Sequence, residues 1–376
     1  GPPGAGKSYT GKHIIAALLQ DGARIGITSN SHKAINNLVL STAKHCQAHS
    51  ISASFACTKA TEDSLATYQI AVLNNKNIHA HLQPSCVIGT TAWGFARQEL
   101  AGQFDYLFVD EAGQVAVANV IAMSRATRNI VFLGDQMQLG QPTQASHPGE
   151  SGLSVLDYLL HRSPTIPADM GIFLDTTYRM HSSINQFISR HIYAGKLQAN
   201  AQNDQRIIEV PPDYHGPLTK SAGIVFVPVE HTGNSQASPE EVCRIQALAQ
   251  DLLGRIYHTG YNAEPTRLIT WEDMLFVAPY NHQVNKLRQV LGTQAKVGSV
   301  DKFQGQEAPI VVLSMCASDP TSSRGLEFLF DRQRLNVALS RAQTLAIVVA
   351  NPGICLATPT SIEQLRLINL VCALQD

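Results

Sequence analysis

The sequence predicts an α/β protein of two lobes, each built on a parallel sheet. The chain has 376 residues, more than the roughly 250–300 at which a single core stops growing. Short apolar runs are continuous rather than alternating, which is typical of strands buried on both faces. Helical stretches separate these runs, as in a doubly wound sheet. We place the boundary between the lobes at residue 171, giving residues 1–170 and 171–376.

The expected elements follow this pattern along the chain. A helix should begin at Lys7, with Ile14, Ile15, Leu18 and Leu19 on one face and Gly22 after its end. Ser238 and Glu241 form a possible capping box around Pro239. Residues 196–223 are polar and contain prolines, so we expect a surface excursion there. Strands are expected within 24–28, 86–91, 105–111, 129–135, 171–181, 223–229, 274–280, 308–315 and 344–352.

Composition limits the class of protein. Hydrophobic residues make up 44% and charged residues 15%, as in an ordinary globular protein. The net charge of −1 disfavours a tight, static nucleic-acid binder, but a motor needs only a local basic groove. The longest apolar runs are about half of the roughly 18 residues that a membrane span needs.

The seven cysteines include no C-x-x-C pair, a usage that suits a reducing cytoplasm. Histidines and cysteines between His45 and Cys86 raise the possibility of a zinc site. Their spacing is irregular, whereas zinc sites usually contain a tight ligand pair. Zinc binding is therefore the less favoured interpretation of this region.

The first eight residues, GPPGAGKS, match the phosphate-binding loop G-x-x-x-x-G-K-[ST]. In such a loop backbone N–H groups surround a polyphosphate, Lys7 reaches the terminal phosphates and Ser8 ligates Mg²⁺. The alternative is a Gly-Pro turn that fits by chance. Such a loop normally follows a buried strand, so we expect a longer protein whose first strand precedes Gly1. The candidate ATP-binding residues here are Gly4, Ala5, Gly6, Lys7, Ser8 and Tyr9.

Acidic residues end the apolar run at LFVDEAGQ. Asp110 can hold Mg²⁺, and Glu111 can orient and deprotonate an attacking water. The next run ends in GDQMQL, where Gln138 can contact both the water and the γ-phosphate. A solvated strand end would explain the acidic pair alone, but the phosphate loop upstream favours catalysis.

Six motifs together resemble superfamily 1 helicases of the up-frameshift-like group, which includes RNA-decay helicases and nuclease-linked DNA helicases. GPPGAGKS, VDEAGQ, GDQMQL, LDTTYRMH, SVDKFQGQE and RLNVALSRA occur in the order and approximate spacing of that family, over nearly the whole chain. The resemblance implies two RecA-like lobes of the P-loop NTPase fold. It also implies ATP and Mg²⁺ in the cleft between the lobes and translocation on a single strand, with 5′ to 3′ as the direction expected of the family.

The resemblance assigns roles to individual residues. Tyr178 would stack on adenine, Glu307 would bind ribose beside a turn at Gln304 and Gly305, and Arg179 and Arg341 would contact the γ-phosphate. The catalytic candidates are therefore Lys7, Glu111, Gln138, Arg179 and Arg341. The family's nucleic-acid positions are Ser29, Asn30, Thr90, Thr91 and Ser299.

The nucleic acid along which the protein would move is either single-stranded DNA or single-stranded RNA, and we favour DNA. Hydroxyls, amides and backbone N–H groups contact phosphates without reading bases, which suits a motor that must move over any sequence. Trp93, Phe95 and Tyr280 could stack on bases or belong to the core. Lys33 and Lys302 could bind phosphates or simply be solvated.

Three positions depart from the family pattern: Ala5, Gln136 and Pro309. Ala5 and Gln136 should be tolerated. Pro309 stands where many relatives have an acid, which weakens the assignment of Glu307, and it should mark the first residue of a strand. TSNSHKAINN and RGLEFL resemble bacterial relatives with an N-terminal RecB-like nuclease domain, but no nuclease acidic cluster occurs here.

Two other functions fit parts of the sequence. The first is a nucleotide-gated clamp or scaffold on nucleic acid that unwinds nothing. The second is a small-molecule phosphotransferase. A general base at Glu111 argues against the clamp, and the arginines of the second lobe argue against the phosphotransferase.

Overall fold

The computed structural model describes residues 1–61, 64–140, 147–161, 163–260, 265–303, 305–318, 331–356, 358–359 and 361–375. The chain divides into two compact units. Residues 1–2 and 6–174 form the first unit, and residues 3–5 and 175–376 form the second. Each unit is an α/β structure around a parallel sheet, as the sequence predicts.

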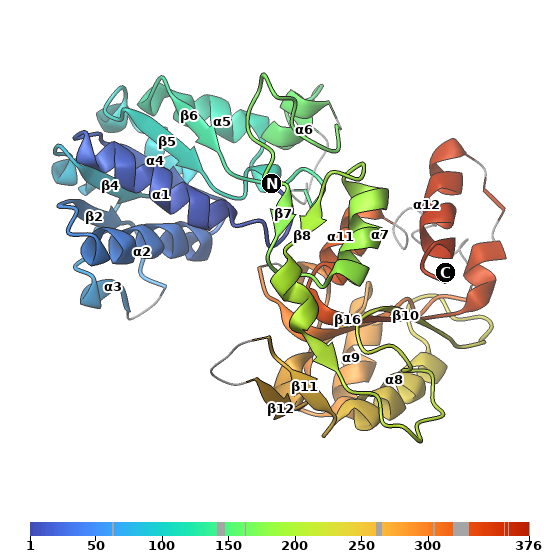
Figure 1. Ribbon diagram of the computed structural model, residues 1–376. Helices are drawn as coiled ribbons and strands as arrows, with labels where there is room; N and C mark the ends of the chain where they lie inside the picture. Colours follow the sequence, from blue (N-terminus) through green and yellow to red (C-terminus); the bar gives the residue numbers. More distant parts are fainter. Residues whose placement is uncertain are drawn as a thin grey trace. The chain divides into compact units, whose positions relative to one another are not determined.

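The first unit is built on a six-stranded sheet of order β3-β2-β4-β1-β5-β6, in which all adjacent strands are parallel (Figure 1). The strands are β1 (Ile25–Thr28), β2 (Ser54–Cys57), β3 (Ala71–Val72), β4 (Cys86–Gly89), β5 (Tyr106–Val109) and β6 (Ile130–Phe132).

Both faces of this sheet are buried. Phe108 of β5 packs into one core, while its neighbours Leu107 and Val109 pack into another. Because successive side chains of a strand point to opposite faces, the strand must be apolar throughout. α1 (Lys7–Gln20) and α2 (His32–Ala48) lie side by side on the first face (Figure 1). The second core receives residues of α4 (Ala92–Phe95), α5 (Val117–Met123) and α6 (Val155–Leu160).

The second unit contains a five-stranded parallel sheet of order β10-β16-β15-β13-β14 (Figure 1). α8 (Pro239–Leu252) and α9 (Asn281–Leu291) pack on one face through a large apolar core. α7 (Ser182–Ile192) and α11 (Arg332–Leu339) also contact the sheet. The strands are β10 (Gly223–Pro228), β13 (Met274–Val277), β14 (Lys296–Gly298), β15 (Ala308–Ser314) and β16 (Ala342–Ala350).

Smaller elements complete the described chain. β9 (Ile207–Ile208), β11 (Ile256–His258) and β12 (Thr266–Leu268) form an antiparallel sheet, and β7 (Thr176–Thr177) pairs with β8 (Gln198–Ala199). The remaining helices are α3 (Ser64–Thr67) and α12 (Ile362–Cys372). The 3₁₀ turns are η1 (Ile78–His81), η2 (Gln98–Leu100), η3 (Ala112–Gln114), η4 (Ser124–Ala126), η5 (Ala201–Gln205), η6 (Trp271–Asp273), η7 (Asp301–Phe303) and η8 (Pro352–Leu356). Within the described residues, no helix combines the length and apolarity that crossing a membrane requires.

Eight of the nine expected strands are confirmed. The strand expected within 171–181 is mostly wrong, because only Thr176–Thr177 form a strand there. The run GIFL at 171–174 forms no strand, and Ile172 is 83% exposed. Residues 170–174 instead line a groove of about 390 Å³ together with residues of β6. An apolar run forms a strand only where a partner supplies ladder hydrogen bonds, and no described strand pairs with this one.

Three local expectations also change. Residues 196–223 are not a mere surface excursion, because Ile208 and Leu218 enter the core of the second unit. Ile14 is 41% exposed rather than buried with Ile15. Pro309 is the second residue of β15, not the first, and the ladder to β16 shifts register there, which accommodates its missing N–H.

Candidate functional site

The phosphate-binding loop runs directly into a helix. α1 begins at Lys7, and Gly4 and Gly6 have φ values of 70° and 78°, which glycine adopts without the steric penalty of a side chain. Lys7 Nζ donates to the carbonyl oxygens of Gly1 (2.7 Å) and Pro2 (3.1 Å). The loop thus combines the free N–H groups of a helix N-terminus with a lysine ammonium, a combination that binds anions.

Two carboxylates follow β5. Asp110 is 6% exposed, and its Oδ1 accepts a hydrogen bond from the Glu111 N–H at 3.0 Å. Burial, and then the neighbouring Glu111, raise the pKa of Asp110 to about 7. Glu111 has a φ of 52°, a left-handed conformation that is uncommon for a residue with a side chain.

The end of β6 lies beside the end of β5. Ala112 N–H donates to Leu133 O at 2.9 Å, which joins the two strand ends. Gln138 is 6% exposed, and its Nε2 donates to Asp135 Oδ2 at 2.8 Å. The sequence-predicted residues Glu111 and Gln138 therefore follow adjacent strands of one sheet, at the edge where open α/β sheets bind ligands.

In the second unit, Arg179 and Glu307 contact each other. The Arg179 guanidinium donates to the Glu307 carboxylate and, through Nη1, to Ser340 O at 3.2 Å. Gln343 Nε2 donates to Glu307 Oε1 at 2.9 Å. Burial alone would raise the pKa of Glu307, but Arg179 and then Gln343 outweigh it and hold the pKa below its usual value.

Two residues that the motifs do not include fix the backbone around Arg179. Asn203 Nδ2 donates to Thr177 O and Met180 O, both at 2.9 Å, and Arg206 Nη1 donates to Arg179 O at 2.6 Å. Asn203 is 2% and Arg206 9% exposed. The sequence signal was weak, since polar residues in a presumed surface excursion gave no reason to expect buried donors.

The other candidates of the second unit differ in exposure. Tyr178 is 59% exposed, whereas Arg341 is 2% exposed. Arg341 Nε donates to Val337 O at 3.1 Å and its Nη1 to Gln306 O at 3.2 Å. Gly305 has a φ of 80°, and Gln304 lies outside the described residues.

The candidate nucleic-acid residues of the first unit follow β1 and β4, which pair in parallel. Asn30 is exposed, and its side-chain amide donates to Gln114 O. Ser29 is 5% exposed. Thr90 is fully buried and bonded to the side chains of Thr58 (3.1 Å) and Asn75 (2.8 Å). Thr91, half-buried, precedes α4.

The second unit supplies Ser299, which follows β14 and is half-buried. Of the three aromatic residues that could stack on bases, Phe95 (0% exposed) and Tyr280 (5%) are buried. Trp93 is 80% exposed. Phe95 and Tyr280 therefore belong to the core, whereas Trp93 lies at the surface, where it could stack on a base. Lys33 and Lys302 are exposed.

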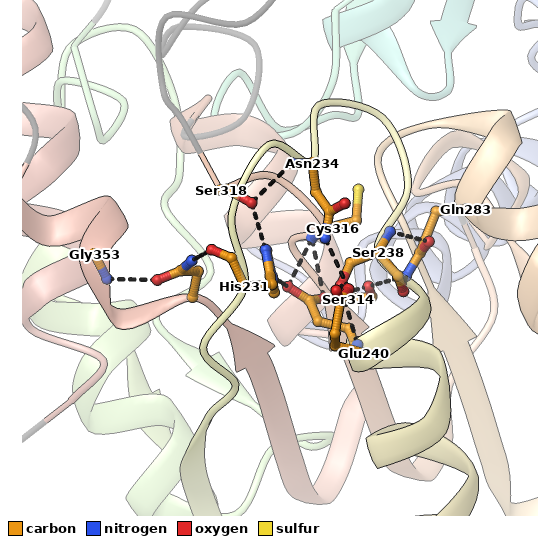
Figure 2. Close-up of polar contacts among 11 residues, drawn as sticks. His231, Asn234, Ser238, Glu240, Gln283, Ser314, Cys316, Ser318 and Gly353 are labelled. Carbon is orange, nitrogen blue, oxygen red and sulfur yellow. Dashed lines mark hydrogen bonds and ion pairs between the residues drawn. The ribbon is translucent and has the colours of Figure 1, made fainter.

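A separate polar network lies at the carboxyl ends of β10 and β15. His231 and Glu241 have fully buried side chains, and His231 Nε2 lies 3.0 Å from Glu241 Oε1. The Glu241 carboxylate also accepts hydrogen bonds from Ser314 Oγ and, at 3.0 Å, from Cys316 N–H. Figure 2 shows these bonds and the continuation of the network from His231 Nδ1 to Ser318 Oγ at 2.6 Å.

Only half of the expected capping box is present. Ser238 Oγ accepts from Glu241 N–H at 3.1 Å, as expected. The reciprocal bond is replaced, because Ser238 N–H donates to Gln283 Oε1 at 2.9 Å. The Glu241 carboxylate instead binds residues from other elements.

A zinc site between His45 and Cys86 finds no support in the geometry. The described part of the chain brings together no group of three or more His, Cys, Asp or Glu side chains that could hold a metal ion. Cys46, Cys57 and Cys86 are buried, and burial raises the pKa of each thiol.

Comparison with known proteins agrees with the motifs. Residues 57–147 and 153–353 each match a family described as "AAA domain". The chain is 27% identical to "RNA helicase Mov10l1" of Mus musculus, covering 96% of this chain and 33% of that protein. It is 28% identical to "Regulator of nonsense transcripts 1 homolog" of Arabidopsis thaliana (74% and 22%). It is 24% identical to "DNA replication ATP-dependent helicase/nuclease dna2" of Schizosaccharomyces pombe (93% and 26%).

The chain thus spans between about a fifth and a third of the length of these relatives. The second match covers more than half of the chain, and together the two matches include the segments after β5 and β6 and the Arg179–Glu307 pair. The resemblance inferred from the six motifs is confirmed. The chain belongs to the AAA-domain family, as a superfamily 1 helicase region of the up-frameshift-like group, and consists of two α/β units on parallel sheets.

Proposed function

We propose that this chain hydrolyses ATP and uses the energy to move along single-stranded nucleic acid. The observation that carries the proposal is the placement of Glu111 and Gln138 after adjacent strands β5 and β6, in the unit whose α1 begins at Lys7. A base, a γ-phosphate sensor and an anion-binding helix start are the parts that phosphoryl transfer to water requires.

Within this proposal each residue has one task. Gly4, Ala5, Gly6 and Tyr9 border the phosphates, Lys7 neutralises their terminal charge, and Glu111 accepts the proton of the attacking water. Gln138 orients that water. From the second unit, Tyr178 stacks on adenine, Glu307 binds ribose, and Arg179 and Arg341 stabilise the charge of the transferring phosphoryl group. Such arginines are worth ~10³ to 10⁵ in rate.

The residues present fit a magnesium ion. Mg²⁺ prefers oxygen ligands and retains several waters, and the Ser8 hydroxyl and the Asp110 carboxylate are such ligands. The buried Asp110, with its raised pKa, is also a carboxylate that a cation would favour in its ionised form. When bound, Mg²⁺ would neutralise phosphate charge. Ser8 and Asp110 would hold it, directly or through water.

We propose that the single strand is bound through its phosphates by residues that follow strands of both sheets. Asn30 and Thr91 in the first unit and Ser299 in the second are accessible enough to contact it. Ser29 would contribute backbone N–H. The buried Thr90 would position Thr91, and the exposed Trp93 would stack on a base.

The similar proteins include both an RNA helicase and a DNA replication helicase/nuclease, so the similarity alone does not select the nucleic acid. We propose single-stranded DNA as the track, movement from 5′ to 3′, a cytoplasmic location, and a longer protein with an N-terminal nuclease domain. The alternative is a nucleotide-gated clamp that binds nucleic acid without unwinding it.

One assay separates these functions. ATP hydrolysis is measured with no polymer, with single-stranded DNA and with single-stranded RNA of the same sequence. Strong stimulation by one polymer supports the motor and identifies its track. Slow hydrolysis that neither polymer changes supports the clamp, and transfer of phosphate to a metabolite supports a phosphotransferase.

A further inference from the structure

Two cysteines of the second unit contact each other through their thiols. Cys355 lies in η8, directly after β16, and Cys372 is the last residue of α12. A side-chain hydrogen bond joins Cys355 to Cys372. Gln375 links the same two residues, because its N–H donates to Cys372 O and its Nε2 donates to Cys355 Sγ, both at 3.0 Å.

Both cysteines are partly exposed, and buried residues lie next to them in the sequence. Cys355 and Cys372 are half-buried and carry no disulfide. Their neighbours Ile354 (1% exposed), Val371 (1%) and Leu374 (4%) are buried. η8 and α12 are in contact, which keeps the two cysteines near each other.

We propose that Cys355 and Cys372 form a redox-active dithiol, which a low-molecular-weight disulfide oxidises to an intrachain disulfide. Nothing in the proposed ATPase mechanism uses either residue, and the inference does not depend on that mechanism.

The two sulfurs have different tasks in this reaction. Burial, and then the hydrogen bond with Cys372, raise the pKa of Cys355 to about 12. A raised pKa disfavours the Cys355 thiolate, so we assign the first attack to Cys372 and the second to Cys355. A thiolate is the nucleophile in thiol–disulfide exchange.

The exchange balances in two steps. The Cys372 thiolate attacks one sulfur of glutathione disulfide, the oxidant's S–S bond breaks, and one glutathione thiolate leaves and takes a proton from solvent. Cys355 then loses its proton to solvent and attacks the Cys372 sulfur of the mixed disulfide, which releases the second glutathione. The two protein thiols each lose one electron, and the oxidant's disulfide gains both.

Thiol counting and peptide mapping test the proposal directly. The folded protein is incubated with glutathione disulfide, freed of it, denatured and titrated for thiols, with the expectation that the count falls from seven to five. Trypsin cuts after Arg341 and Arg366, which places Cys355 in peptide 342–366 and Cys372 in peptide 367–376. The expected product is these two peptides joined by a disulfide, which a reductant separates.

Matched variants make the outcome decisive. Cys243 is exposed, so C243S removes the competing surface thiol and should leave the linked peptides unchanged. C355S and C372S should each abolish them, and C355S should leave glutathione on Cys372. A count that stays at seven would overturn the proposal. So would glutathione adducts at both residues without linked peptides, or linkage that appears only when the protein is denatured before oxidation.

Discussion

Arg179 and Glu307 lie 128 positions apart in the sequence and form an ion pair in the second unit. Both are residues to which the family resemblance gives a nucleotide contact. Their pairing holds the Arg179 side chain in a defined position. ATP would then meet an arginine that is already ordered, which lowers the entropic cost of recruiting it.

The first prediction concerns pH. The pKa of Glu307 is lowered in the folded protein, so its ion pair stabilises the fold above the unfolded value of about 4.3, and this stability is lost as pH falls through the folded pKa. The Glu307 side chain is 44% exposed, so solvent screening limits the effect to below about 1 kcal/mol.

Urea unfolding of the wild type and Glu307→Gln checks this expectation. The wild type should have the higher midpoint near neutral pH, and the difference should shrink as the pH falls below the unfolded value of about 4.3 and vanish below the lowered pKa of the folded state. Glu363→Gln is the control, because Glu363 pairs with Arg366 at 3.6 Å and both side chains are well exposed. A difference that grows with acidification would contradict the assignment.

The second prediction concerns Asn203, which donates to the backbone carbonyls of Thr177 and Met180, and Arg206, which donates to that of Arg179. Removing these donors should let Arg179 move away from the transferring phosphoryl group. A misplacement of about 1 Å can cost roughly 10²-fold in rate. For Arg206→Ala and Asn203→Ala we therefore expect kcat/KM for ATP to fall about 10- to 100-fold.

Steady-state ATPase kinetics test this role, with thermal unfolding measured in parallel. Gln202→Ala is the matched control, since Gln202 lies on the same turn and is exposed; it should hydrolyse ATP normally. Arg206→Lys should recover part of the lost activity. If the two alanine variants lose only stability and keep the wild-type kcat/KM, these residues do not position Arg179.

The third prediction concerns Glu241, whose carboxylate accepts hydrogen bonds from Ser314 and Cys316 and contacts His231. Glu241→Ala would leave buried donors without an acceptor. Removing one partner of such a buried network typically costs about 3–5 kcal/mol of unfolding free energy.

The adjacent Glu240 offers a close control. It is exposed and accepts from Ser238 Oγ and Asn234 Nδ2, both at 2.8 Å. Its replacement by alanine should cost below about 1 kcal/mol, because water can satisfy the groups left behind. Urea unfolding measures both, and equal costs would refute the special role of Glu241.

Local sequence was sufficient for eight of the nine expected strands and for the residues that follow them, but it did not predict β2, β3 and β14. β5 is apolar throughout because both of its faces are buried, so its end, and with it Asp110 and Glu111, could be located by composition alone. Gln138 could be located in the same way after β6. Such features depend on a few consecutive residues, which the sequence displays directly.

Contacts that join distant segments could not be predicted in this way. The pattern around Ser238 suggested a reciprocal capping box, but β15 brings Ser314 and Cys316, 73 and 75 positions later, to the Glu241 carboxylate. Asn203 and Arg206 were missed for the same reason. Their partners are backbone carbonyls. Because every residue has a backbone carbonyl, the sequence does not indicate which residue accepts the hydrogen bond.

The fourth prediction concerns Glu111 itself. Its left-handed backbone (φ 52°) and the bond from its N–H to Asp110 Oδ1 define a turn directly after β5. Glu111→Gln keeps the size of the side chain and removes only the proton acceptor. ATP binding, measured with a fluorescent analogue at equilibrium, should therefore stay near the wild-type value. Turnover should fall about 10²- to 10⁴-fold. Glu99→Gln, in the same unit but half-exposed and paired with Arg97, should retain full activity, and undiminished hydrolysis by Glu111→Gln would exclude Glu111 as the general base.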